Sequence, residues 1–182
     1  MSLRRYSLWE VVKHAFSKEV WDVLWPAIGD TLYMVIFTAV ITLVLGIMLG
    51  IVLAVTGKEG ITPVSWIHRG LGTIINCLRS LPQIIMIIIT LPLARALLGK
   101  AYGVNACIIA LAASCTPMFA RLIEGALLEL EKGKIEAAKS MGSTNLKIIF
   151  RIMLPEVIPA IIRAFTVALI AIISMTALAG NF

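Results

Sequence analysis

Residues 136–155 read EAAKSMGSTNLKIIFRIMLP, and this polar-interrupted segment lies between two strongly apolar stretches. An amphipathic helical turn runs into Gly142, and glycine commonly ends helices because it adopts positive φ just after the cap. Ser143 and Thr144 are suited to cap a second helix, which we expect to stop at Pro155. The segment therefore predicts two short helices joined by a tight turn at a membrane surface.

Seven residues of this segment match the spacing of the EAA loop of ABC importer permeases: Glu136, Ala137, Ala138, Gly142, Ile152, Leu154 and Pro155. In that family the loop forms a coupling helix that docks into a cleft on a cytoplasmic ATP-binding subunit. The resemblance implies the same role here, for a coupling loop that spans residues 121–155. Small side chains would let a partner surface approach closely, and apolar neighbours would anchor a groove contact. An ordinary helix–turn–helix connector between membrane spans is the alternative interpretation.

The composition is that of a membrane protein. Of the 182 residues, 60% are hydrophobic and 14% are charged, whereas soluble domains average about 45–50% and about 25%. The net charge of +6 is therefore a topology signal and not a sign of nucleic-acid binding. Cys77, Cys107 and Cys115 lie in apolar sequence, which predicts buried small side chains and neither disulfides nor metal ligands.

The apolar stretches predict an all-α bundle of about four membrane helices. Residues 1–30 are amphipathic and contain three tryptophans, which predicts an N-terminal interfacial helix that is broken near Pro26. A transmembrane domain would follow over residues 31–182. Its spans are expected at 31–57, in an interrupted stretch around 79–95, at 101–120 with an end near Pro117, and at 157–182.

Two stripes of small residues predict close helix contacts. Gly46, Gly50 and Ala54 recur at intervals of four in the first span, and lipid-facing glycines are the alternative interpretation. The last span has a similar stripe, formed by Ala160, Ala164, Ala168 and Ala171.

The stretch Arg79-Ser80-Leu81-Pro82 opens an uncharged run too short for a full span, which Pro92 also interrupts. A charge at the centre of a membrane helix costs about 2.5–3.5 kcal/mol, so Arg79 belongs near an end or beside water. One interpretation is a bent helix beside the transport pathway, with Arg79, Ser80 and Pro82 adjacent to it. The other is an arginine that extends to the cytoplasmic interface from the end of its helix.

Lysines and arginines are distributed unevenly over the predicted loops. If the loops after the first and third spans are cytoplasmic, that side holds ten of the 16 basic residues and the other side holds six. The excess of positive charge in cytoplasmic loops then places the N-terminus outside and the coupling loop in the cytoplasm.

The resemblance extends over roughly residues 20–180 and is greatest to the membrane subunit of methionine importers, which are type I ABC importers of bacterial inner membranes. The stretches Thr116–Arg121 and Glu124–Glu129 contribute to it. It implies a homodimer of multi-pass subunits that works with two copies of an ATPase and a substrate-binding lipoprotein. ATP would bind the partner subunit, so no cofactor is expected in this chain. The family continues past the position of Phe182 with one more helix, so we expect a C-terminally truncated chain.

Three other functions compete with methionine import. A permease for polar amino acids would share the coupling loop, although such proteins more often have Arg-Gly-Thr-Pro at residues 79–82. A membrane-embedded enzyme is disfavoured, since the sequence has no histidine cluster or Gly-x-Ser-x-Gly motif and its acidic residues lie in predicted loops or helix ends. A passive channel would need no docking loop.

Overall fold

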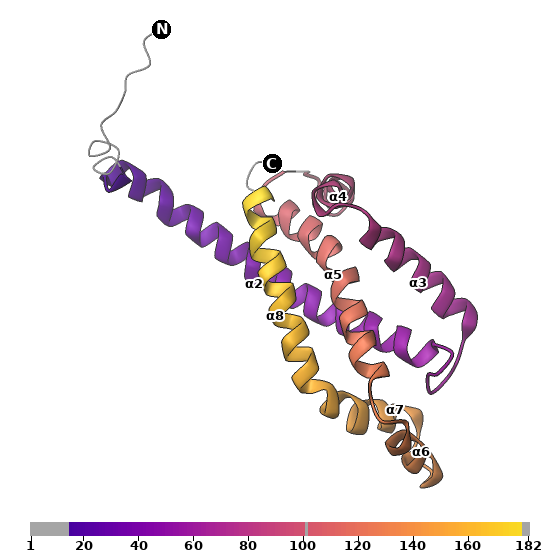
Figure 1. Cartoon of the computed structure of the whole chain (residues 1–182). Coiled ribbons are helices and arrows are strands. Elements are labelled where there is room, and N and C mark those ends of the chain that lie inside the picture. The colour runs from indigo at the N-terminus through magenta and orange to yellow at the C-terminus, as the bar shows by residue number, and fades with distance from the viewer. Residues whose placement is uncertain (1–14, 101, 180–182) are drawn as a thin grey trace.

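The computed structural model describes residues 15–100 and 102–179, and all regular elements within them are helical (Figure 1). The elements in chain order are α2 (Lys18–Thr56), α3 (Ser65–Ser80), α4 (Gln83–Leu98), α5 (Val104–Leu128), α6 (Lys132–Ser140), α7 (Asn145–Ile148), the π-helical turn η1 (Ile149–Met153) and α8 (Leu154–Ala179). The predicted all-α class is confirmed.

Helix α2 is much longer than a bilayer is thick. Its 39 residues extend over about 58 Å, against about 30 Å of hydrocarbon. The first part projects from the bundle (Figure 1), and residues 18–30 are exposed.

The predicted break near Pro26 is wrong, because α2 continues through it. The carbonyl of Asp22, which loses its helical partner to the proline, lies on this exposed part, where water can bond to it. The predicted segment over residues 1–14 lies outside the described residues.

The centre of the fold is the contact between α2 and α5. A Cβ atom on Gly50 would lie 2.6 Å from Cβ of Ile123 and 2.8 Å from the carbonyl oxygen of Ala120. Gly46 meets the ring of Phe119 in the same way, and both glycines are buried. The predicted helix-contact stripe in the first span is therefore confirmed, and its partner is α5.

We expect Gly50→Ala to destabilise the bundle, because the added methyl group would overlap the side chain of Ile123 and the backbone of Ala120. Overpacking of this kind costs about 1–3 kcal/mol. Gly29→Ala is the matched control, since Gly29 lies in the same helix and no atom lies within 4 Å of the place that its methyl group would take. Glycine-to-alanine changes in helices otherwise stabilise by about 1 kcal/mol. Thermal unfolding in detergent should rank Gly50→Ala below wild type and Gly29→Ala at or above it; equal stability of the two variants would contradict the packing argument.

The second predicted span is broken as expected. Helices α3 and α4 meet at a bend of 117°, where Leu81 and Pro82 separate them. Pro92, however, does not interrupt α4. Among the described residues, three helices are long and apolar enough to cross a membrane, and the bent pair makes a fourth if it counts as one span. With the bent pair counted as one span, the number agrees with the predicted four.

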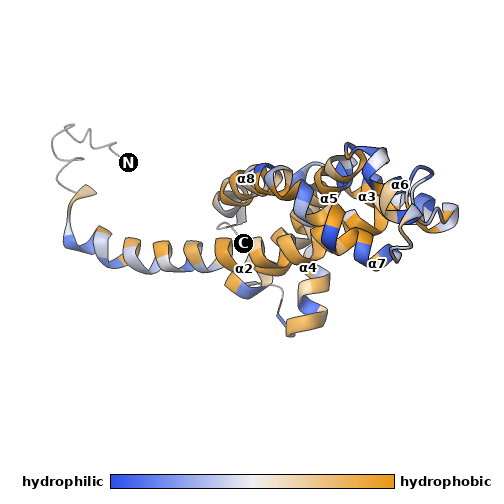
Figure 2. Cartoon of the chain, turned by 90° about the horizontal axis from the view of Figure 1, so that it is seen from below, coloured by the Kyte–Doolittle hydropathy of each residue, from blue (hydrophilic) through white to orange (hydrophobic). Residues whose placement is uncertain are grey.

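Two predicted helix ends are wrong in the second half of the chain. Helix α5 passes through Pro117 and continues to Leu128, so residues 121–128 belong to it and not to the coupling loop. Beyond the loop, α7, η1 and α8 follow one another without a stop at Pro155. Figure 2 shows that α2, α4 and α8 consist largely of apolar residues, and many of their large apolar side chains are exposed, as in helices in contact with lipid or other helices.

Small side chains also pack α8 against the rest of the bundle. Ala164 and Ala168 are buried in the core cluster that includes Phe119, which confirms the predicted helix contact for these two residues, whereas Ala160 and Ala171 are half-buried. The cysteines differ from the prediction in one case. Cys107 and Cys115 are buried, but Cys77 is exposed on α3 because this helix covers the bundle with only one face.

Candidate functional site

The coupling segment, which we define as residues 131–155, forms one end of the molecule (Figure 1). Its first turn has a specific backbone geometry. Gly142 has φ +76°, its amide donates to the Lys139 carbonyl at 2.9 Å, and the Ser143 amide donates to the Ala138 carbonyl at 3.1 Å. These two bonds are those of a Schellman motif, which closes the end of α6. The predicted helix end at Gly142 is confirmed.

The second helix begins as predicted but continues differently. Thr144 occupies the N-cap position of α7, although its hydroxyl makes no capping hydrogen bond. The chain then widens into the π-turn η1 before α8. A regular helix would press the carbonyl of Arg151 against the ring of Pro155, and the wider turn lies just where this contact would occur. The predicted stop at Pro155 is wrong for this reason.

The seven residues of the coupling motif fall into two groups. Ala138 is buried in the core, and Ile152 and Leu154 are half-buried against it. The other four are exposed: Glu136, Ala137, Gly142 and Pro155. The first group holds the segment to the bundle, and only the second is free to meet another protein.

Three large apolar side chains on this segment are exposed and were missed by the sequence analysis. Met141 is 78% exposed, Leu146 is 68% exposed and Phe150 is 62% exposed. We call them the coupling patch. The i, i+4 spacing of Leu146 and Phe150 was a usable signal, because it places them on a different face from the buried Ile148 and Ile149. Exposed apolar groups beside a tight turn are suited to insertion into a groove.

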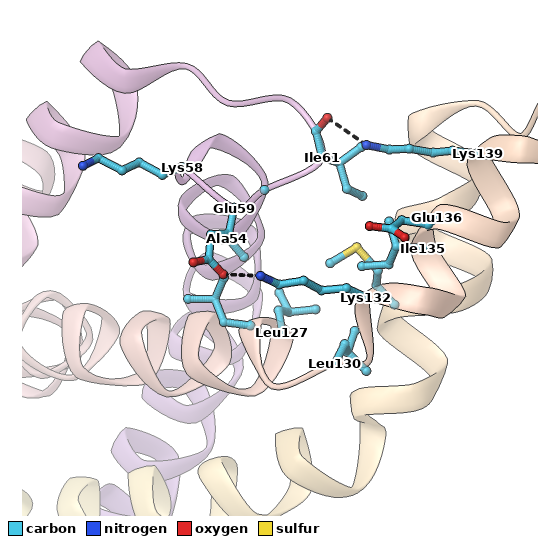
Figure 3. A pocket seen from close by; sticks show the side chains of 13 residues that line it. Ala54, Lys58, Glu59, Ile61, Leu127, Leu130, Lys132, Ile135, Glu136 and Lys139 are labelled. Carbon is cyan, nitrogen blue, oxygen red and sulfur yellow. Dashed lines mark hydrogen bonds and ion pairs between the residues drawn. The ribbon is translucent and has the colours of Figure 1, made fainter.

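Polar contacts tie α6 to the loop between α2 and α3 (Figure 3). Lys132 Nζ donates to Glu59 Oε2 at 2.6 Å, and Lys139 Nζ donates to the Ile61 carbonyl at 3.4 Å. The hydrogen bond from Lys132 lowers the pKa of Glu59, helped by the ammonium charge. A cavity of about 270 Å³ lies between these elements, with Ala54 and Leu127 among its apolar lining residues.

A further ion pair attaches α6 to the start of α8. Lys134 Nζ donates to Glu156, and this hydrogen bond raises the pKa of Lys134. Glu131 lies 3.8 Å from the same ammonium group. All of these charges are exposed, so their effect is to orient α6 and not to stabilise the fold substantially.

The residues predicted to flank a pathway lie far from the coupling segment. Arg79 is exposed in the last turn of α3, Ser80 donates to the Cys77 carbonyl at 2.7 Å, and Pro82 is the N-cap residue of α4. The bend that they form lies toward the opposite end of the bundle (Figure 1). The structure therefore does not bring the two predicted groups together.

A buried ion pair is the second feature that the sequence analysis missed. Glu124 is 5% exposed within α5, not at a helix end, and its Oε2 lies 2.5 Å from Arg121 Nη1. Arg121 Nη2 also donates to the Gly72 carbonyl at 3.0 Å, which links α5 to α3. The i, i+3 spacing of the pair was visible in the sequence, but its link to α3 was not.

The sequence is similar to those of known membrane transport proteins. Residues 46–182 match a family described as the inner membrane component of binding-protein-dependent transport systems. The chain is 40% identical over 160 residues to a probable D-methionine transport system permease protein of Vibrio cholerae, covering 88% of this chain and 71% of that protein. It is 47% identical over 157 residues to a methionine import system permease protein of Bacillus subtilis, covering 86% and 71%.

The fold agrees with a solved structure as well. Inward-facing crystals of the MetNI methionine ABC transporter contain a chain with a TM-score of 0.87 and 32% identity, with 91% of this chain and 77% of that chain covered. A crystal structure of an amino acid ABC transporter with histidines has a TM-score of 0.64 at 18% identity, which shows a common fold only.

Proposed function

This chain belongs to the family of inner membrane components of binding-protein-dependent transport systems, and we propose that it is the permease subunit of an ATP-driven importer for methionine. It performs no bond-making chemistry in this role. It forms the path through the membrane, and ATP is bound and hydrolysed by a separate subunit.

The observation that supports this function best is the coupling segment. It combines a rigid turn at Gly142 with the exposed coupling patch, and ion pairs fix its orientation on the bundle. Movement of an attached ATPase would be passed on through α6 to α8 and the loop after α2, since the contacts of Lys134 and Lys132 connect these elements. This linked movement of α6, α8 and the loop after α2 would shift the bundle between inward-open and outward-open states.

The proposed substrate rests on the relatives. Two of them, at 40% and 47% identity, are named as permeases for D-methionine or methionine. A polar amino acid is the second candidate. The proposed assembly contains two copies of this chain, two ATPase subunits and a substrate-binding lipoprotein on the outer face.

Uptake measurements test this function. The chain would be expressed with its ATPase and binding protein in a strain without its own methionine importer. We expect ATP-dependent uptake of labelled methionine that excess unlabelled methionine reduces and excess glutamine does not. No uptake of labelled methionine, combined with ATP-dependent uptake of labelled glutamine, would instead favour the polar amino acid permease.

The proposed orientation has the N-terminus outside and the coupling segment in the cytoplasm. We expect a cysteine at Gly133, an exposed position with open space around it, to resist a membrane-impermeant thiol reagent in intact cells. A cysteine at Tyr102, between α4 and α5 and 69% exposed, should react from the outside. Both changes would be made after replacing Cys77, Cys107 and Cys115. The reverse labelling pattern would contradict this orientation.

A further inference from the structure

We propose that a cavity of about 390 Å³, bounded by the end of α2, the start of α3 and the end of α5, binds the phosphate of an anionic phospholipid headgroup. Its volume is within the range of small-molecule sites, about 300–1,000 Å³. Its polar lining includes Lys58, Glu59, Ser65, His68, Arg69 and Glu124. This site is separate from the coupling patch, and the proposed transport function does not depend on it.

Both acidic residues of the cavity already have partners. Glu59 accepts a hydrogen bond from Lys132 at 2.6 Å, and Glu124 is paired with Arg121 at 2.5 Å. Neither Lys132 nor Arg121 lines this cavity. The negative charges are therefore balanced by cations from outside it, and they leave the remaining lining positive.

The two basic residues of the cavity are free to bind an anion. Within the described part of the chain, neither Lys58 nor Arg69 has an ion-pair partner. Lysine and arginine form strong charge-assisted hydrogen bonds to phosphate, and arginine can bind two of its oxygens at once. Together, Lys58 and Arg69 give the cavity an unbalanced charge of +2, which favours an anionic headgroup.

The start of α3 adds donors on the same side. Its N-cap residue, Val64, has no side-chain acceptor, so no cap satisfies the first amides of this 16-residue helix. Ser65, the first helical residue, lines the cavity. The His68 ring is fixed by a 3.1 Å contact between Nδ1 and the Leu53 carbonyl, which requires a proton on Nδ1. A helix N-terminus and the two free cations thus meet at one cavity, and both favour an anion.

The position of the cavity favours a lipid over a soluble anion. Lys58 is the first charged residue after the 27 uncharged residues 31–57, so it marks a membrane boundary. Trp66, in the first turn of α3, is 76% exposed, and tryptophan prefers the membrane–water interface. Basic pockets between membrane helices at this level bind anionic headgroups.

Titration of the purified 182-residue chain tests the site. Short-chain phosphatidylglycerol, short-chain phosphatidylcholine and inorganic phosphate would each be added in neutral detergent, and the thermal unfolding midpoint measured. We expect phosphatidylglycerol alone to raise the midpoint saturably. The double variant Lys58→Gln/Arg69→Gln should lose about thirtyfold in apparent affinity. The control is Arg95→Gln/Lys100→Gln, which removes the same exposed charges at the end of α4 and should behave as wild type.

Three results would overturn the assignment. Equal phosphatidylglycerol affinity of wild type and the Lys58/Arg69 variant would exclude this cavity. Saturable stabilisation by inorganic phosphate, with an affinity that matches the lipid, would identify a soluble anion as the ligand. Unchanged lipid affinity combined with loss of ATPase co-purification in the same variant would identify a protein contact instead.

Discussion

Leu146→Asp is expected to abolish co-purification of the ATPase subunit and, with it, ATP-dependent uptake. Leu146 is 68% exposed in the coupling patch, so the change leaves the chain's own core intact. In a docked complex, a carboxylate at this position would be buried in an apolar groove without a partner. Anchor residues of interfaces contribute about 2 kcal/mol or more, which corresponds to about a thirtyfold loss of affinity, and a buried unpaired charge adds to this. Pull-down from detergent extracts measures the effect.

The neighbouring residue provides the control for this change. Asn145→Asp introduces the same carboxylate one position earlier, at an exposed site in the first turn of α7, and removes no apolar group. Acidic residues are favourable at helix N-termini, so α7 should tolerate it. We expect Asn145→Asp to retain the ATPase and Leu146→Met to retain it as well. If Leu146→Asp still retains the ATPase at the wild-type level, the coupling patch is not the docking surface.

The features that the sequence predicted correctly depend on local geometry or on regular spacing. Gly142 ends α6 because its backbone has φ +76°, a conformation that residues with a side chain rarely adopt. Lack of space is not the reason, since no atom lies within 4 Å of the place that a Cβ atom would take. The stripe that includes Gly50 was visible because a helix repeats its face every three to four residues. In both cases the decisive information lies within a few turns of one helix.

Prolines caused most of the errors. Pro26, Pro92 and Pro117 all lie inside helices of the structure, although each removes a backbone donor. In water an interior proline usually ends or kinks a helix. In lipid an unpaired, exposed backbone costs more, so α4 and α5 continue through Pro92 and Pro117. At Pro26 water can bond to the freed carbonyl instead. Helix ends predicted from proline are therefore unreliable in such a chain.

The coupling motif illustrates a different limit. Its spacing identified the segment but did not distinguish residues that face the core from residues that face outward. Ala138 matches the motif yet is buried, whereas Phe150 is outside the motif yet is 62% exposed. This distinction depends on how α6 and α7 pack against α5 and α8, and a single sequence does not specify that packing.

The buried pair on α5 could not be predicted for the same reason, and it gives the largest expected effect on stability. Glu124→Ala would leave the guanidinium of Arg121, whose side chain is only 20% exposed, without its carboxylate. Removal of one member of a buried ion pair costs about 3–5 kcal/mol, because the remaining charge stays buried and unpaired. We expect a large decrease in the thermal unfolding midpoint in detergent. Glu129→Ala, at the exposed end of the same helix, should change it little.

A double variant separates the ion pair from simple loss of packing. Arg121→Met/Glu124→Leu removes both charges and keeps similar volumes, and apolar replacement of a whole buried pair is often neutral or stabilising. The Gly72 carbonyl on α3 loses its donor in this variant, so some destabilisation is expected. We nevertheless expect the double variant to be more stable than Glu124→Ala, because no uncompensated charge remains. If the double variant is the less stable of the two, the pair acts mainly as a structural clamp between α3 and α5, and the unpaired charge is not the cause of the loss.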